Sequence, residues 1–119
     1  MSDHVLVVAE NTINVGQVNN LKALVEEMIN AIKHDEPGTL NYEWFITEDG
    51  TSVHVYERYI NSEAYLIHLE NFGQKYAERC FTYLTVTNIA IYGNPSDKVR
   101  EVFKAYDPVY MSPFAGIAR

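Results

Sequence analysis

The sequence predicts an α+β fold of the split β-α-β, ferredoxin-like type, in which helices cover one face of an antiparallel sheet. One observation is that the hydrophobic period switches between the strand repeat of two and the helix repeat of three to four, in the order β-α-β-β-α-β. Another is that no linker, repeat or low-complexity tract interrupts the 119 residues. We therefore expect one domain over residues 1–119, with a core at 4–92 and a C-terminal helix and tail at 95–119.

The first two elements are a short strand and an amphipathic helix. Residues 5–9 are apolar and mostly β-branched, which predicts a strand buried on both faces. From Val18 to Ile32, apolar residues recur three or four positions apart, as on one face of a helix. This helix should end before Pro37, because proline disfavours helical geometry in the residue before it.

Residues 39–60 predict a β-hairpin around Asp49-Gly50, a pair that suits a two-residue type I′ turn. Such a turn fixes the register of the two strands. One face then carries the pairs Ile46–Val53, Trp44–Val55, Tyr42–Glu57 and Leu40–Tyr59. The other, more polar face carries Phe45 opposite His54, Glu43 opposite Tyr56 and Asn41 opposite Arg58.

The second half of the chain predicts two more helices and a strand. Asn61 should cap a helix that Gly73 divides, and Ser96 should cap a shorter one. Residues 83–92 read as a strand, and the tail from residue 107 has no clear period. One face of the strand is expected to hold Leu84, Val86, Asn88, Ala90 and Tyr92.

The composition excludes several classes of function. Nine Lys and Arg residues against 16 Asp and Glu residues give a net charge of −7, which makes nucleic acids and anionic membranes poor partners. Cys80 is the only cysteine, so no intrachain disulfide can form. Residues 1–4 lack the order of a signal peptide, and no apolar run is long enough to cross a membrane. We expect a cytoplasmic protein.

Motifs for the common cofactors are absent from the sequence. There is no glycine-rich dinucleotide or phosphate loop and no nucleophile elbow. The four histidines have no metal-ligand spacing, so we expect neither a cofactor nor a metal.

The sheet face away from the helices is predicted to be too apolar to remain exposed. It is expected to include Phe45, Tyr56, Ile60, Ile89 and Ile91. A second copy of the sheet is the expected cover, so the sequence predicts a homodimer.

Three polar residues are predicted on the helix-covered face, where an unpaired polar group costs several kcal/mol. They are Glu57, His68 and Asn88. Burial would raise the pKa of Glu57 unless a cation or a donor compensates. With the aromatic residues Tyr42, Trp44, Tyr59 and Tyr65 around them, these groups would form a small-molecule pocket.

Each of these residues also has a purely structural interpretation. Glu57 could pair with Arg58 or with a helix residue, and His68 could donate to a nearby carbonyl in the core. Asn88 could bridge backbone groups, and Trp44 and the tyrosines could simply be core aromatics.

Three stretches in register carry a family resemblance. They are Glu36-Pro37-Gly38-Thr39-Leu40-Asn41-Tyr42-Glu43, Val55-Tyr56-Glu57-Arg58-Tyr59, and Ser62-Glu63-Ala64 followed by His68-Leu69. Over about residues 4–92 the chain resembles the antibiotic biosynthesis monooxygenase family. This resemblance implies a dimeric α+β barrel with a pocket between sheet and helices. Family members include cofactor-independent monooxygenases of quinols and polyketide phenols. The haem-degrading members resemble the chain at residues 11–13, but their tryptophan after the hairpin is missing here.

The resemblance implies a cofactor-independent monooxygenase whose partners are a small aromatic molecule, a quinol or polyketide-like phenol, and molecular oxygen. His68 or Glu57 would take the substrate proton, and Asn88 and Asn11 would orient the substrate oxygen. Stacking walls would come from Trp44, Tyr42 and Tyr65. The alternative is a non-catalytic, ligand-binding or regulatory dimer, and a third possibility is a dimer with a collapsed pocket.

Overall fold

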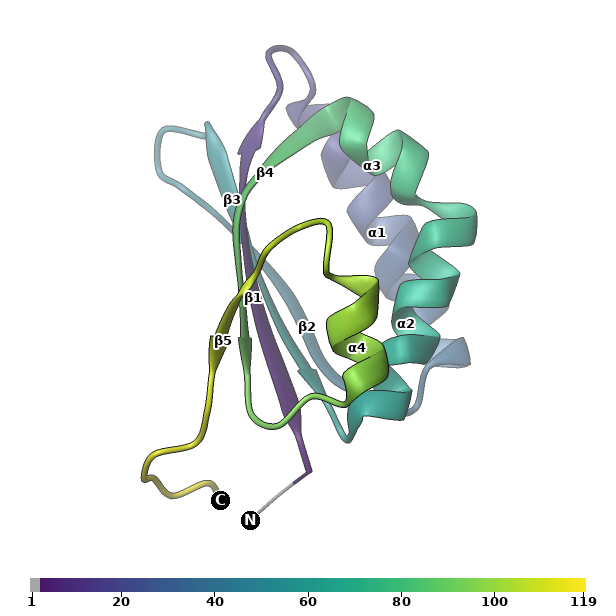
Figure 1. Ribbon diagram of the computed structural model, residues 1–119. Coiled ribbons are helices and arrows are strands. Elements are labelled where there is room, and N and C mark those ends of the chain that lie inside the picture. The colour runs from purple at the N-terminus through teal and green to yellow at the C-terminus, as the bar shows by residue number, and fades with distance from the viewer. Residues whose placement is uncertain (1–2) are drawn as a thin grey trace.

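The computed structural model describes residues 3–119, which form one five-stranded sheet with helices on a single side (Figure 1). The strands are β1 (Val5–Ile13), β2 (Thr39–Ile46), β3 (Ser52–Tyr59), β4 (Leu84–Tyr92) and β5 (Val109–Met111). They lie in the order β2-β3-β1-β4-β5, antiparallel except that β5 runs parallel to β4. The expectation about residues 1–4 concerns in part Met1 and Ser2, which lie outside the described residues.

Helices cover one face of the sheet, here called the inner face (Figure 1). They are α1 (Val18–Asp35), α2 (Ser62–Lys75), α3 (Ala77–Tyr83) and α4 (Asp97–Val102). The predicted α+β, ferredoxin-like fold is confirmed, and so are both helix caps: the Asn61 side chain accepts from the Ala64 N–H, and Ser96 accepts from the Val99 N–H. The break between α2 and α3 falls at Tyr76 rather than at Gly73.

The hairpin register is confirmed from Asn41 to Ile46, but both of its ends differ from expectation. The loop has four residues instead of two, because the Gly50 N–H bonds to the Thr47 carbonyl and Gly50 has a φ of +74°. The register survives because Thr47 lies opposite Ser52 with either loop. A bulge near Leu40 makes Thr39, not Leu40, the partner of Tyr59.

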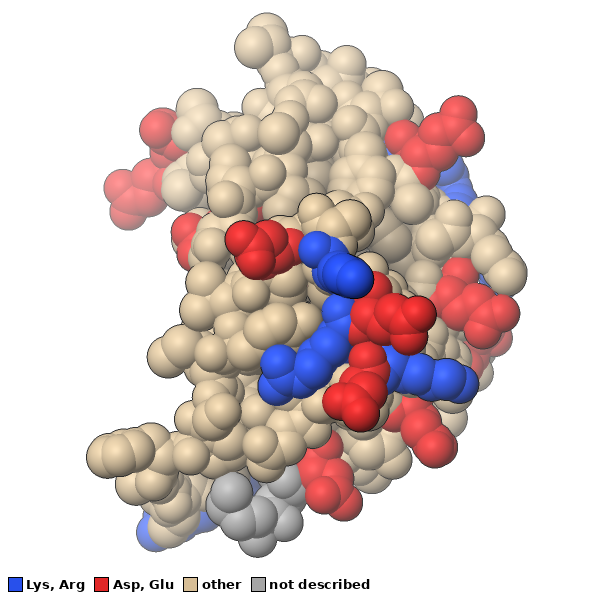
Figure 2. Space-filling view, viewed as in Figure 1, with Lys and Arg blue, Asp and Glu red and all other residues tan. Residues whose placement is uncertain are grey.

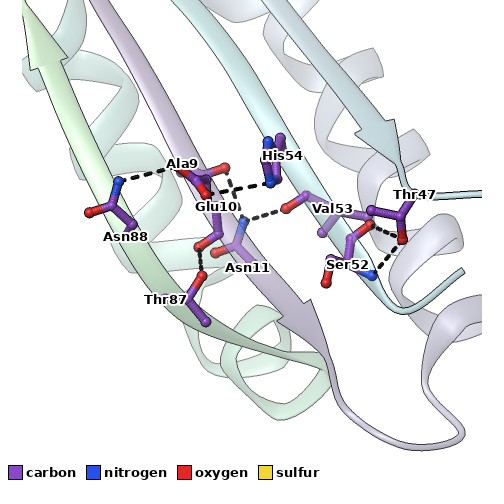
Figure 3. A network of polar contacts seen from close by, with 9 residues as sticks. All are labelled: Ala9, Glu10, Asn11, Thr47, Ser52, Val53, His54, Thr87 and Asn88. Carbon is purple, nitrogen blue, oxygen red and sulfur yellow. Dashed lines mark hydrogen bonds and ion pairs between the residues drawn. The ribbon is translucent and has the colours of Figure 1, made fainter. Parts of the chain in front are cut away.

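A bulge in β4 reverses the predicted alternation of that strand. Glu10 of β1 pairs with Asn88 and Asn11 pairs with Val86, so Thr87 is an extra residue. The Thr87 hydroxyl donates to the Glu10 carbonyl at 2.9 Å (Figure 3). Because each added residue turns the following side chains to the opposite face, the second half of β4 is out of phase with the first.

The predicted faces of Asn88, Ile89 and Ile91 are therefore wrong. Asn88 is exposed on the open face, where its amide donates to the Glu10 carboxylate at 3.2 Å (Figure 3). Ile91 is fully buried under the helices, and Ile89 packs against the same core cluster. A sequence pattern cannot reveal this reversal, since the extra residue shows only in the pairing with β1.

The core lies between the inner sheet face and the helices. β1 contributes Val5 and Val7 to it, whereas Leu6 and Val8 on the opposite face are only half-buried. The expectation that this strand is buried on both faces is thus wrong for the single chain, and β1 is also longer than the predicted residues 5–9.

The surface around α4 carries charges of both signs. Figure 2 shows Lys and Arg side chains interspersed with Asp and Glu side chains there, and much of the rest of this face is uncharged. Within residues 3–119, no helix has the length and apolar character needed to cross a membrane.

Candidate functional site

A cavity of about 350 Å³ lies between the inner sheet face and helices α2, α3 and α4. Its volume falls in the range typical of small-molecule sites. Six of the seven residues predicted from the sequence line it: Asn11, Tyr42, Trp44, Glu57, Tyr65 and His68. The seventh, Asn88, is on the opposite face of the sheet and does not contribute to the cavity.

His68 is the central polar side chain of this cavity. The Asn61 cap starts α2 so that His68, two turns later, points at the sheet and is only 6% exposed. Its Nδ1 lies 2.9 Å from Oε1 of Glu36, and its Nε2 lies 3.9 Å from Oε1 of Glu57. When Nδ1–H donates to Glu36, the neutral imidazole has its lone pair at Nε2. In that tautomer Nε2 is the acceptor atom, on the side of the ring that faces Glu57.

Glu36 fixes His68 in this orientation. It follows the last turn of α1, and its buried carboxylate also accepts hydrogen bonds from the Thr39 hydroxyl at 2.9 Å and the Asn71 amide at 3.3 Å. Burial raises the pKa of Glu36, but the bonds from His68, Asn71 and Thr39 outweigh burial and hold the pKa below its usual 4.5. Glu36 is thus a carboxylate at neutral pH.

Sequence reasoning missed the role of Glu36. In the sequence, Glu36 stands out only as the first residue of a motif that carries the family resemblance. A signal was available, because Pro37 forces α1 to end at this position, close to the sheet that the helix covers. Its partner His68 lies 32 residues away, and no local pattern links the two.

Glu57 faces the cavity, as its predicted register requires. The Tyr59 hydroxyl donates to Oε1 of Glu57 at 2.5 Å. Burial raises the pKa of Glu57 above its usual 4.5, while His68 and the Tyr59 hydrogen bond oppose the increase. The structural alternative of a pair with Arg58 is wrong, because Arg58 is on the other face and contacts His4 at 3.1 Å.

Aromatic residues surround these groups. Tyr59 and Tyr65 stack with ring centroids 4.5 Å apart, and Tyr42 meets Trp44 edge to face at 6.1 Å. Burial and the charge of Glu57 raise the pKa values of all three tyrosines well above 10, so they are neutral phenols.

Trp44 has an unsatisfied donor. Among buried side-chain atoms of the described chain, its Nε1 alone lacks a partner in hydrogen-bond geometry. The indole is nevertheless a close neighbour of Tyr42, because it lowers the pKa of Tyr42 while burial, the larger effect, raises it.

Asn11 contributes an amide to the cavity from the centre of the sheet. It is almost fully buried, and its Nδ2 donates to the carbonyls of Ala9 at 3.4 Å and Val53 at 3.3 Å (Figure 3). These bonds occupy the nitrogen, so the side-chain carbonyl oxygen is the group that remains for a ligand.

Cys80 is part of the apolar wall. Burial raises the pKa of its thiol to about 11, so the group is neutral and behaves as a small hydrophobic side chain. No group of His, Cys, Asp and Glu side chains within residues 3–119 is arranged to hold a metal ion.

The fold and the cavity together define an α+β domain with an internal cavity and a buried histidine that a carboxylate orients. The family model described as "Antibiotic biosynthesis monooxygenase" matches residues 4–78, and the chain belongs to this family. No curated protein matches the sequence.

Several solved structures share the fold. MupZ from Pseudomonas fluorescens superimposes with a TM-score of 0.87 at 22% identity, over 100% of this chain and 91% of that one. SnoaB from Streptomyces nogalater, a cofactor-independent oxygenase, superimposes with a TM-score of 0.67 at 14% identity, over 80% of this chain and 96% of that one. Rv0793 from Mycobacterium tuberculosis superimposes with a TM-score of 0.63 at 25% identity, over 79% of this chain and 96% of that one.

Proposed function

We propose that the protein is a cofactor-independent monooxygenase of a small aromatic phenol or quinol. The observation that carries this proposal is the buried His68–Glu36 pair, whose free Nε2 borders a cavity lined mainly by aromatic and aliphatic side chains. An electron-rich phenol that loses its proton there becomes an anion able to reduce dioxygen. The surrounding side chains exclude the water that would intercept the intermediates.

The reaction balances without a cofactor. For an anthrone, the ring CH₂ carbon becomes a carbonyl that holds one atom of O₂, and the other oxygen atom leaves as water with the two hydrogens. The substrate supplies all four electrons, so no external reductant is required. The enzyme has only to remove the first proton, position the anion and exclude water.

His68 is the proposed base, with Glu36 orienting it. Glu57 lies 3.9 Å from the same Nε2 and is the second acceptor for the proton. The Asn11 carbonyl oxygen would accept from a substrate hydroxyl, since the amide nitrogen is already bonded to the backbone.

The aromatic residues would form the walls around the ring. Tyr42, Trp44 and Tyr65 all line the cavity and offer ring faces and edges to a planar ligand. Asn88, expected from the sequence to orient the substrate, has no part in this proposal because it lies on the other side of the sheet.

Oxygen uptake and isotope labelling test the proposal. Anthrone and 1,4-dihydroxynaphthalene are incubated with the protein in an oxygen electrode, and anthraquinone formed under ¹⁸O₂ is analysed by mass spectrometry. We expect catalysed uptake with one labelled oxygen per anthraquinone. The His68→Ala variant should lose at least about 100-fold in rate, the usual contribution of a general base.

Two results would contradict this function. If oxygen uptake were unchanged in His68→Ala and Glu57→Gln, neither residue would be the base of the reaction. Ligands that raise the melting temperature but never yield product would instead favour the alternative, a non-catalytic ligand-binding or regulatory dimer.

We also propose that two copies pair through the open sheet face, as a dimeric α+β barrel. Large apolar side chains from four strands are about half exposed there: Phe45, Tyr56, Tyr92, Val109 and Met111. An exposed patch of this kind is typical of an interface in a small domain. A self-complementary contact between identical sheets would cover it.

The oligomeric state tests this pairing directly. Sedimentation equilibrium should give a dimer for the wild type and a monomer for Tyr56→Asp, because one buried, unpaired carboxylate per subunit opposes association. The Ile67→Asp variant is a matched control, since Ile67 is similarly exposed but belongs to α2 on the helical side. A monomeric wild type would exclude the dimer.

A further inference from the structure

A row of neighbouring aromatic rings runs from His68 toward the surface, past the C-terminal end of α4. The ring centroids of His68 and Tyr65 are 6.5 Å apart, those of Tyr65 and Phe103 are 5.7 Å apart, and those of Phe103 and Tyr106 are 5.9 Å apart. Exposure rises from 2% at Tyr65 to 53% at Tyr106. All four side chains line the cavity, so this row marks a wall that leads outward.

A second row follows the side of α3. The centroids of His68 and Phe72 are 6.3 Å apart, and those of Phe72 and Phe81 are 5.9 Å apart. Phe81 is 43% exposed, and all three residues line the cavity. The two rows thus share His68 as their inner end and finish at two half-exposed rings, Phe81 and Tyr106.

Most polar groups of the cavity lie at the inner end; one exception is Asn11, which pairs with Val86 of β4. His68, Glu57 and the Tyr42 ring lie together, with His68 and Tyr42 centroids 5.1 Å apart. The side chains that α3, β4 and the segment from Val102 to Tyr106 contribute to the lining are apolar apart from Tyr106, and they include Phe81, Ile89 and Phe103. A ligand that fills this space needs one polar end and an apolar body.

We propose that the substrate is a phenol or quinol with an apolar substituent opposite its hydroxyl, and that this substituent lies between Phe81 and Tyr106 at the cavity entrance. The inference rests on the proposed function for the hydroxyl end and adds the shape of the substrate. Val102 and Tyr106 then determine specificity. They come from the C-terminal segment, which follows residues 4–78, the part of the chain that the family model matches.

Binding measured without oxygen tests the substituent. Trp44 is the only tryptophan and lines the cavity, so quenching of its emission by a naphthol reports occupancy. We would compare 1-naphthol with 4-hexyl-1-naphthol, and confirm both affinities by calorimetry. The hexyl compound should bind at least about tenfold more tightly, a factor that burial of only two of its six carbons would give.

Entrance variants separate this effect from general hydrophobicity. In Tyr106→Ala and Phe81→Ala, the preference for the hexyl compound should fall at least threefold, while 1-naphthol binds as to the wild type. Phe114→Ala is the control, because this phenylalanine is wholly exposed and outside the cavity. Thermal unfolding would verify that the variants are folded, which their half-exposed positions favour.

Three results would overturn the proposal: no preference for the hexyl compound in the wild type, no binding of either compound at millimolar concentration, or equal weakening of both ligands in the entrance variants. Oxygen uptake is a separate measurement. A retained hexyl preference with no turnover would contradict the monooxygenase function and leave the substrate's shape supported.

Discussion

Glu36 and Glu57 are two buried carboxylates of one site, and the structure predicts opposite consequences for the same substitution at each. Glu36→Gln removes the charge that accepts hydrogen bonds from His68 and Thr39, and sets an amide NH₂ against the Asn71 donor. Hydrogen bonds to a charged group contribute about 1.5–3 kcal/mol each, compared with about 1 kcal/mol for neutral pairs. We expect a loss of about 3 kcal/mol in the free energy of unfolding.

In a chain of 119 residues, this loss lowers the melting temperature by about 12 °C. Glu57→Gln should behave differently, because the carbonyl of Gln still accepts from Tyr59 and the substitution removes a charge that burial disfavours. Its melting temperature should stay within about 3 °C of the wild type or exceed it. Calorimetric or circular dichroism melts at neutral pH measure both values.

The two carboxylates should also give the stability opposite dependences on pH. The lowered pKa of Glu36 means that its stabilisation is complete above its usual 4.5 and is lost as pH falls through the folded value below 4.5. The difference in the free energy of unfolding between the wild type and Glu36→Gln should therefore become smaller at acidic pH. The raised pKa of Glu57 means that the wild type loses stability relative to Glu57→Gln as pH rises from 4.5 through the folded value.

Two results would contradict this prediction: a Glu36→Gln variant with the melting temperature of the wild type, or equal decreases in melting temperature in Glu36→Gln and Glu57→Gln. Either result would mean that the carboxylate of Glu36 does not hold His68 through a charge-assisted hydrogen bond. A Glu27→Gln variant is the control for charge alone, because Glu27 pairs with Arg79 on the exposed surface.

Three other predictions concern the scaffold and the cavity wall. Gly93→Ala should destabilise the fold by about 2–3 kcal/mol in urea titrations, because Gly93 has a φ of +111° and a Cβ there would lie 2.7 Å from the His4 carbonyl oxygen. Asn61→Ala should cost about 1 kcal/mol by the same measurement, through loss of the α2 cap. Cys80 should react with a thiol reagent at pH 8 much more slowly than in the unfolded protein, because burial raises its pKa to about 11; equally rapid labelling of the native protein would disprove this.

The sequence by itself determined the elements and most of their faces, because the signals are local. Pro37 ends α1, and the side chains of Asn61 and Ser96 cap the helices that follow them. The turn at residues 47–52 sets the hairpin register, and this register alone places Glu57 and Trp44 on the inner face. A family resemblance in short motifs was enough to anticipate the cavity.

Tertiary structure decided the features that depend on pairing between distant segments. The bulge at Thr87 exists only in the register of β4 against β1, and it moved Asn88 out of the site. The contact of Glu36 with His68 joins the residue that follows α1 to a residue of α2, and β5 forms only because β4 offers it an edge. Local periodicity records which residues share a face of one element, but contacts between elements depend on how the whole chain packs.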